Sequence, residues 1–254
     1  MRAARSLLRL LNTLLTWVEI LLMLLAAFYS IYALWDNRQI HETAEAVQNS
    51  LLAYRPSGEE TEESGPGFRE LQALNPDVRS WLSLTGTKID YPVLQGTSNR
   101  TYLNTDVYGE YALAGSIFLD SRNAGDFSDP YSLVYGHNME NSRMFGDLAK
   151  YRNRNFFDEN REGVLLLPGG EYRLRILACL EMKADESLFF DPGENGWDNM
   201  ALLDYAAENA VQADRELLAY TAQRPDCRLL ALASCAVGGT DLRTVVLTLM
   251  EEVL

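Results

Sequence analysis

The chain has 254 residues, of which 47% are hydrophobic and 23% are charged, so it can form one sizeable packed domain with additional segments and is not a disordered chain. Its formal net charge is −14, and its lysines and arginines form no cluster beyond the first nine residues. Binding to nucleic acid needs a basic surface that neutralises phosphates, so this charge balance argues against a nucleic-acid partner.

The first 35 residues predict a membrane anchor. Three arginines lie within residues 1–9, a short basic tail, and the apolar run that follows, residues 10–35, contains one charged residue, Glu19. About 20 apolar residues in a helix span a bilayer core. The run is longer than the apolar part of a secretory signal peptide and has no clear cleavage site. Because basic residues precede the span, we expect the N-terminus in the cytoplasm and the acidic remainder of the chain outside the cell.

Residues 36–67 are predicted to connect the anchor to the outer domain. Residues 36–54 carry apolar side chains at three- and four-residue steps, which is the spacing of a helix. Residues 55–67 are acidic and rich in Pro, Gly and Ser, a composition typical of a linker or a mobile loop. We therefore expect a helical stalk followed by an acidic linker.

The outer domain, residues 68–254, is predicted to be mainly β. Short apolar runs separated by turn residues predict strands, and residues 144–151 and 197–211 favour helices. Many short strands with few helices are typical of a closed or nearly closed β-barrel with helical additions, an α+β fold. The strands are predicted at residues 89–94, 115–120, 133–136, 164–167, 172–182, 228–233 and 244–250.

Three cysteines leave at least one free thiol, and their low density argues against a disulfide framework. Cys179 lies within an apolar run, where a buried small side chain is expected, and Cys227 lies in a turn. Cys235 ends an apolar run and precedes a glycine-rich loop. An isolated cysteine is most often buried and inert, but a thiol at a strand end beside such a loop is also accessible for nucleophilic chemistry.

A histidine and an arginine also stand at predicted strand ends. His137 follows an apolar run, although on position alone a turn or capping histidine is the more common case. Arg243 begins the strand after Cys235, and its guanidinium has the donors to hold a developing oxyanion, although a lone arginine is by default a surface residue. The other histidine, His41, lies in the stalk and is most simply solvated. A thiol, a base and an anion stabiliser together indicate nucleophilic catalysis more specifically than any one alone.

No metal or cofactor is predicted. The three cysteines and the one candidate histidine lack zinc-ligand spacing. Asp120, Asp126 and Asp129 lack the spacing of a calcium loop, and no glycine-rich phosphate motif occurs.

The segments that carry these residues resemble the class B sortases from about residue 68 to residue 253. The last segment, residues 231–235 (ALASC), stands where the family carries its TLxTC motif, with Arg243 leading the final strand. Ala231 and Ser234 replace the usual threonines, and Ala233 stands where many members have a serine that contacts substrate. The other similar segments are residues 75–82, 89–96, 99–104, 115–123, 134–139 (VYGHNM) and 144–148.

The resemblance implies a sortase-type closed β-barrel with an N-terminal helical extension and a single N-terminal anchor on the outer face of a Gram-positive cell. It implies that Cys235 is the nucleophile, His137 its acid/base partner and Arg243 the oxyanion stabiliser. It also implies that Asn99, Leu103, Ser234 and the loop between Met182 and Trp197 contact the substrate peptide.

Members of this family cut a sorting signal of a surface protein after its Thr, form a thioacyl-enzyme and transfer the protein to an amine. The acceptor is a peptidoglycan precursor amine, or a pilin lysine in polymerising members, and the sequence does not distinguish the two. A hydrolysing peptidase on the same thiol and a non-enzymatic, membrane-tethered binding module on the same barrel are further alternatives.

Overall fold

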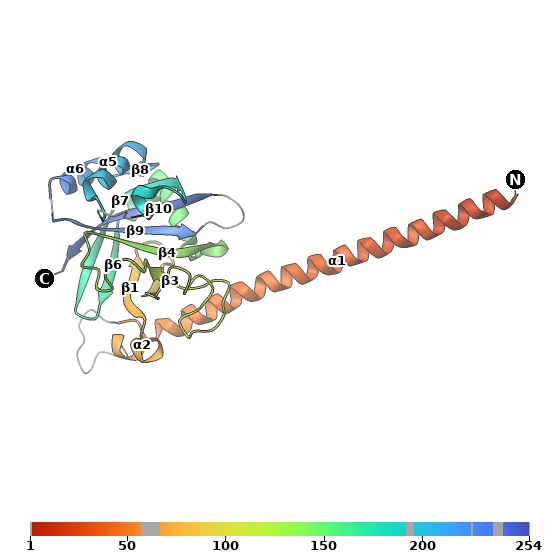
Figure 1. The fold of residues 1–254 in the computed structure, drawn as a ribbon, viewed down its shortest axis with the longest axis horizontal. Coiled ribbons are helices and arrows are strands. Elements are labelled where there is room, and N and C mark those ends of the chain that lie inside the picture. The colour runs from red at the N-terminus through yellow and green to blue at the C-terminus, as the bar shows by residue number, and fades with distance from the viewer. Residues whose placement is uncertain (1, 57–66, 192–195, 225, 236–240, 254) are drawn as a thin grey trace. The chain divides into compact units, whose positions relative to one another are not determined.

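The structure is a computed structural model, and it describes residues 2–56, 67–191, 196–224, 226–235 and 241–253 (Figure 1). Contacts divide the chain into two compact units, Met1–Thr43 and Ala44–Leu254. Most of the predicted acidic linker lies outside the described residues. Residues 236–240, which follow Cys235, do so as well.

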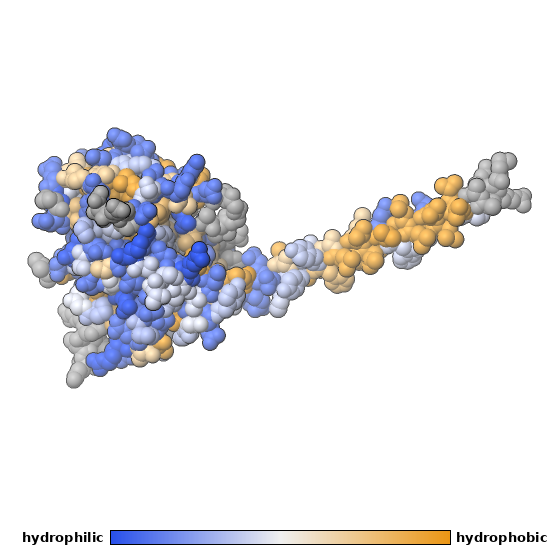
Figure 2. All heavy atoms as spheres, in the orientation of Figure 1, coloured by the Kyte–Doolittle hydropathy of each residue, from blue (hydrophilic) through white to orange (hydrophobic). Residues whose placement is uncertain are grey.

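The predicted anchor and most of the predicted stalk form one helix, α1 (Arg2–Leu52). This segment contains no glycine or proline, and leucine and alanine are strong helix formers, so nothing in the sequence interrupts the helix before Pro56. An 18-residue stretch of the helix has a mean hydropathy of 2.1 and no burial within the protein, so its length and composition suffice to cross a membrane. Figure 2 shows this stretch as a nearly continuous band of hydrophobic residues.

Eight strands close into a barrel, as the sequence predicted. Their order is β10-β9-β4-β3-β2-β1-β6-β7, and β7 pairs again with β10. The short strands β5 (Arg143–Met144) and β8 (Gln212–Ala213) pair with β4 and β7. The barrel strands are β1 (Val78–Leu84), β2 (Asp90–Leu94), β3 (Ile117–Leu119), β4 (Tyr131–Met139), β6 (Glu162–Leu167), β7 (Gly170–Lys183), β9 (Arg228–Cys235) and β10 (Leu242–Glu252).

The strand directions bring three strand ends to one rim of the barrel. Strands β4 and β9 are parallel neighbours, so their C-terminal ends meet at the same rim. Strand β10 is antiparallel to β9 and therefore begins at that rim. The three predicted catalytic residues stand at these strand ends.

Alternating side chains form two apolar clusters, one on each face of the barrel wall. Leu230, Leu232 and Val246 belong to the cluster that fills the barrel. Ala231, Ala233 and Cys235 belong to the outer cluster, which includes buried residues of α2, α5 and α6. Odd-numbered residues at the end of β9 therefore face the outer side.

Helices cover part of the outer face. Asp198 and Asp214 cap α5 and α6 by accepting hydrogen bonds from backbone N–H groups of the first turn. The helix predicted at 197–211 is α5, and the one predicted at 144–151 is the 3₁₀ helix η2. The helical elements of the second unit are α2 (Phe68–Leu74), η1 (Glu140–Ser142), η2 (Gly146–Arg152), α3 (Arg154–Glu159), α4 (Ser187–Phe190), α5 (Asn199–Asn209) and α6 (Arg215–Ala222).

Candidate active site

His137, Cys235 and Arg243 lie in one row across three neighbouring strands. His137 on β4 pairs directly with Cys235 on β9. On the other side of β9, Val245 of β10 pairs with Ala233, and this antiparallel register, continued by two residues, brings Arg243 opposite Cys235. Side chains of paired residues project from the same face of a sheet, and neighbouring strands are about 4.8 Å apart. The fold therefore brings the thiol, the imidazole and the guanidinium together on the outer face.

The Cys235 thiol is nearly enclosed, with an exposed fraction of 8%. Burial raises the pKa of Cys235, while the charge of Arg243 and a hydrogen bond from it oppose the rise without cancelling it. The thiol is therefore mostly protonated at neutral pH, and attack on a carbonyl requires a base that takes its proton.

The imidazole of His137 forms a hydrogen bond with a backbone carbonyl group. Its Nε2 lies 2.7 Å from the carbonyl oxygen of Leu103. A carbonyl oxygen only accepts hydrogen bonds, so Nε2 carries the proton in this geometry and Nδ1 is left to exchange a proton. The strand is also fixed at this residue, because Phe145 N donates to the carbonyl oxygen of His137 at 2.9 Å.

Arg243 offers a donor that the described residues leave unused. Its Nε is buried without a hydrogen-bond partner among them, and its guanidinium carbon lies 5.4 Å from the centre of the Phe190 ring. Arg243 also lines a pocket of about 500 Å³, together with Asn99 and Tyr135. A buried, unsatisfied donor beside a nucleophile is suited to bind an oxygen that becomes negatively charged.

A buried carboxylate organises the wall of this pocket. Asp120 is fully buried and accepts hydrogen bonds from Arg122 Nε at 2.9 Å and Arg122 Nη2 at 2.8 Å. Asn99 Nδ2 donates to Asp120 Oδ2 at 2.8 Å, and the Tyr135 hydroxyl donates to the same oxygen at 3.2 Å. Burial alone would raise the pKa of Asp120, but the hydrogen bonds from Arg122 and Asn99 outweigh it and lower this pKa.

Sequence and structure comparisons identify the family. No family model matches the chain. Sortase B of Listeria monocytogenes is 42% identical over 121 residues, 47% of this chain and 48% of the relative, so this match spans about half of the relative's length. Sortase B of Staphylococcus aureus is 28% identical over 200 residues, 78% of this chain and 81% of the relative.

A solved structure decides the assignment. The chain is similar to Spy0129, a Streptococcus pyogenes class B sortase involved in pilus biogenesis, with a TM-score of 0.65 and 37% identity over 72% of this chain and 97% of that chain. This chain belongs to the class B sortases. The resemblance and the barrel fold predicted from the sequence are thereby confirmed.

The three residues predicted to contact substrate lie in three different environments. Asn99 lines the pocket beside Arg243, and Leu103 approaches His137 through its carbonyl oxygen while its side chain packs on the outer cluster. Ser234 is buried and accepts a hydrogen bond from Thr244 N at 3.0 Å. Its neighbour across the sheet, Gly136, faces the barrel interior. The structure therefore does not bring the Ser234 hydroxyl to the face that carries Cys235.

Sequence reasoning did not single out Arg122 and Tyr135, which line the pocket beside Arg243. Asp120 lacks the spacing of a calcium loop, but an aspartate directly after an apolar run, with an arginine two residues later, is a local sign of a buried ion pair. Phe190 lies in the predicted substrate loop and stacks on Tyr135 with ring centres 6.4 Å apart. Residues 192–195 of that loop lie outside the described residues.

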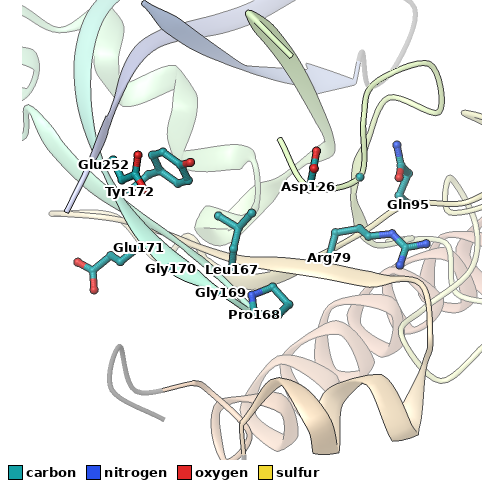
Figure 3. A pocket seen from close by; sticks show the side chains of 11 residues that line it. Arg79, Gln95, Asp126, Leu167, Pro168, Gly169, Gly170, Glu171, Tyr172 and Glu252 are labelled. Atoms are coloured by element: carbon teal, nitrogen blue, oxygen red, sulfur yellow. The ribbon is translucent and has the colours of Figure 1, made fainter. Parts of the chain in front are cut away.

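A second pocket, of about 580 Å³, contains none of the predicted site residues (Figure 3). It lies where β6 ends and β7 begins. Arg79, Gln95 and Asp126 are on one side, and the turn around Pro168 is on the other. Two of the predicted site residues, Asn99 and Arg243, line the other pocket.

Asp120→Asn is expected to destabilise the domain by about 2 kcal/mol at pH 7, because a neutral amide accepts the hydrogen bonds of Arg122, Asn99 and Tyr135 less well than the buried carboxylate does. The folded-state pKa of Asp120 lies below its unfolded value near 3.9, so its contribution is present above the unfolded pKa and is lost as pH falls through the folded pKa. Urea unfolding at pH 7 and at pH 3 should show a smaller difference between variant and wild type at pH 3. Asp126→Asn, an exposed carboxylate on the same loop, is the control and should change stability by less than about 0.5 kcal/mol. An equal loss for Asp120→Asn at both pH values would contradict this explanation.

Proposed function

We propose that this chain is a cysteine transpeptidase that cleaves a sorting signal after its Thr and transfers the acyl part to an amine through a thioacyl-enzyme. The observation that supports it most directly is the row of His137, Cys235 and Arg243 across β4, β9 and β10. Membership of the class B sortases, a family of transpeptidases, supports the same reaction.

In the first half of the proposed reaction, the thiol proton passes to Nδ1 of His137 and the sulfur of Cys235 bonds to the carbonyl carbon. The carbonyl oxygen becomes an oxyanion, and Arg243 donates hydrogen bonds to it. The carbon–nitrogen bond then breaks as His137 protonates the departing amine, which leaves a thioester. The Leu103 carbonyl keeps the imidazole oriented during both proton transfers.

In the second half, an acceptor amine attacks the thioester and gives a proton to His137. The carbon–sulfur bond breaks and the sulfur takes a proton back. Asn99 is proposed to contact the bound peptide from the pocket wall, and Leu103 to line the groove near His137. For Ser234 we propose a positioning role, because its hydroxyl holds the start of β10, and with it Arg243, against β9.

The acceptor is proposed to be an amine of a peptidoglycan precursor. A pilin lysine is the second candidate, and it is supported by the similarity to Spy0129, which is involved in pilus biogenesis. We propose that residues 10–35 of α1 anchor the enzyme in the cell membrane with the N-terminus in the cytoplasm. Helix length, hydropathy and the arginines before the span support this orientation.

The proposal is tested by incubating the full-length protein in detergent with sorting-type pentapeptides and competing acceptors. These are a glycine peptide, a lysine-bearing pilin peptide and water. Mass spectrometry should detect a thioester on Cys235 that ends in Thr, and an amide product with the preferred amine. A folded protein that forms no acyl adduct with any pentapeptide would overturn the proposal, and a product formed only with water would assign a hydrolase instead.

A further inference from the structure

The terminal segment of α1, residues 44–52, belongs to the second compact unit and makes specific polar contacts with it. The side chain of Gln48 has an exposed fraction of 8%. Its Nε2 donates to the carbonyl oxygen of Lys88 at 3.0 Å, and its Oε1 accepts from the Tyr91 hydroxyl at 2.8 Å and from Arg143 Nη1 at 3.4 Å. Glu45, one turn earlier, forms an ion pair with Arg143. A buried amide with three hydrogen-bond partners, one of them a backbone carbonyl, restrains the positions of all three.

These partners lead to the hairpin of β4 and β5, which carries His137. The Tyr91 hydroxyl accepts a hydrogen bond from Met144 N at 3.0 Å. Burial raises the pKa of Tyr91 to about 12, so the hydroxyl stays protonated at neutral pH and donates to Gln48 at the same time. Met144 pairs with Asn138, and the next residue, Phe145, donates from its backbone to His137. The hydrogen bonds that start at Gln48 therefore reach Met144, the residue before Phe145, whose backbone N–H bonds to His137.

The hairpin needs this external support because its backbone is strained. Asn141, Ser142 and Met144 have φ values of 60°, 63° and 49°. A non-glycine residue in this region costs on the order of 1–3 kcal/mol and persists only where its surroundings fix it. Lys88 Nζ donates to the carbonyl oxygen of Asn141 at 3.4 Å, so the loop that Gln48 holds also contacts the strained turn.

We propose that Gln48 and Glu45 are positioning residues that hold the hairpin of β4 and β5 so that His137 stays opposite Cys235. This inference rests on the proposed function, in which His137 exchanges protons with the thiol. It gives the end of α1 an indirect role in the reaction, because Gln48 and Glu45 contact Lys88, Tyr91 and Arg143 and act on His137 only through them. The helix that is proposed to anchor the enzyme would then also position its acid/base residue.

The test compares Gln48→Met with Gln39→Met in the full-length protein in detergent. Met preserves the length of the side chain and removes its hydrogen bonds, and Gln39 is an exposed residue of α1 in the other unit. Gln48→Met should lower kcat for acyl transfer on the order of 10-fold and leave KM within about 2-fold, because it displaces a reacting group without touching the substrate. Gln39→Met should match wild type.

A second readout reports on His137 and does not require turnover. The rate at which iodoacetamide alkylates Cys235 at pH 7, followed by peptide mass spectrometry, should fall in Gln48→Met. In a His137→Ala background Gln48→Met should cause no further loss, because a residue that acts through His137 has nothing left to position. Equal fold losses in both backgrounds, or no loss in either, would overturn the inference. If the wild type is alkylated normally but transfers no acyl group, the proposed function fails while this comparison still decides the positioning role.

Glu45→Gln keeps the inference testable if Gln48→Met does not fold. The Glu45 side chain is half-exposed, so its replacement is not expected to unfold the domain. Glu42→Gln is its matched control, because Glu42 pairs with Arg38 on the same helix. The charge exchange Glu45→Arg with Arg143→Glu should restore part of the alkylation rate that Glu45→Gln loses. Failure of both Glu45→Gln and the exchange to change this rate would count against a role for the ion pair.

Discussion

Cys235→Ala is expected to abolish acyl transfer, with a loss of at least about 10⁴-fold in kcat, while the domain stays folded. The variant removes the sulfur that forms the covalent bond to substrate in the proposed reaction. The change deletes one small, nearly buried atom, so we expect the free energy of unfolding to fall by about 1 kcal/mol or less. Turnover of a sorting-signal peptide and trapping of the acyl adduct measure the first effect, and urea unfolding measures the second.

Cys227→Ala is the matched control for this variant. Cys227 is also buried in the outer cluster, and the hydrogen-bond partner of its thiol is Asn199 of α5, away from the row on β4, β9 and β10. The control should keep wild-type acyl transfer. Turnover by Cys235→Ala that approaches the wild-type rate would exclude a thioacyl mechanism.

Arg243→Ala is expected to lower kcat by about 10²–10³-fold, the usual loss when one oxyanion donor is removed. It should also change the titration of the nucleophile. Arg243 lowers the pKa of Cys235, so its removal raises this pKa further and shifts the midpoint of the alkylation rate to higher pH. A stopped-flow alkylation profile between pH 6 and 10, compared with steady-state kcat, separates the two effects.

Arg243→Lys and Arg215→Ala are the comparison variants. Lysine keeps the charge but lacks the planar fork, so Arg243→Lys should keep most of the pKa effect and lose much of the effect on kcat. Arg215 is an exposed residue at the start of α6, and its removal should change neither quantity. A decrease in kcat for Arg243→Ala without any shift of the alkylation midpoint would show that the guanidinium does not contact the resting thiol.

The strands of the barrel could be predicted from the sequence because their determinants are local, whereas the sortase-type barrel was predicted from the family resemblance. Short apolar runs, such as those of β9 and β10, with turn residues between them mark strands without knowledge of their neighbours. Helix α6 was not predicted. Its signal, Asp214 as a cap followed by Leu217, Leu218 and Thr221 on one buried face, is short and follows directly after a longer helix.

For the site, the residues could be predicted from local pattern, but their arrangement could not. Each of Cys235, His137 and Arg243 ends or begins an apolar run, which local pattern reveals, but their common row depends on the parallel pairing of β4 with β9. That pairing joins segments far apart in the chain, so no local pattern specifies it. The side of the sheet on which Ser234 projects follows from the same register. The contact of Leu103 with His137 is a backbone contact and leaves no trace in residue type.

The Cys235 thiol should be slow to oxidise in the absence of substrate. Oxidation of cysteine to sulfenic and sulfinic acids proceeds through the thiolate and requires access, and Cys235 offers little of either before substrate arrives. Hydrogen peroxide should therefore inactivate the enzyme slowly. In the proposed location outside the cell, where cytosolic reductants do not regenerate sulfur, a nucleophile that is rarely ionised while idle is oxidised less often.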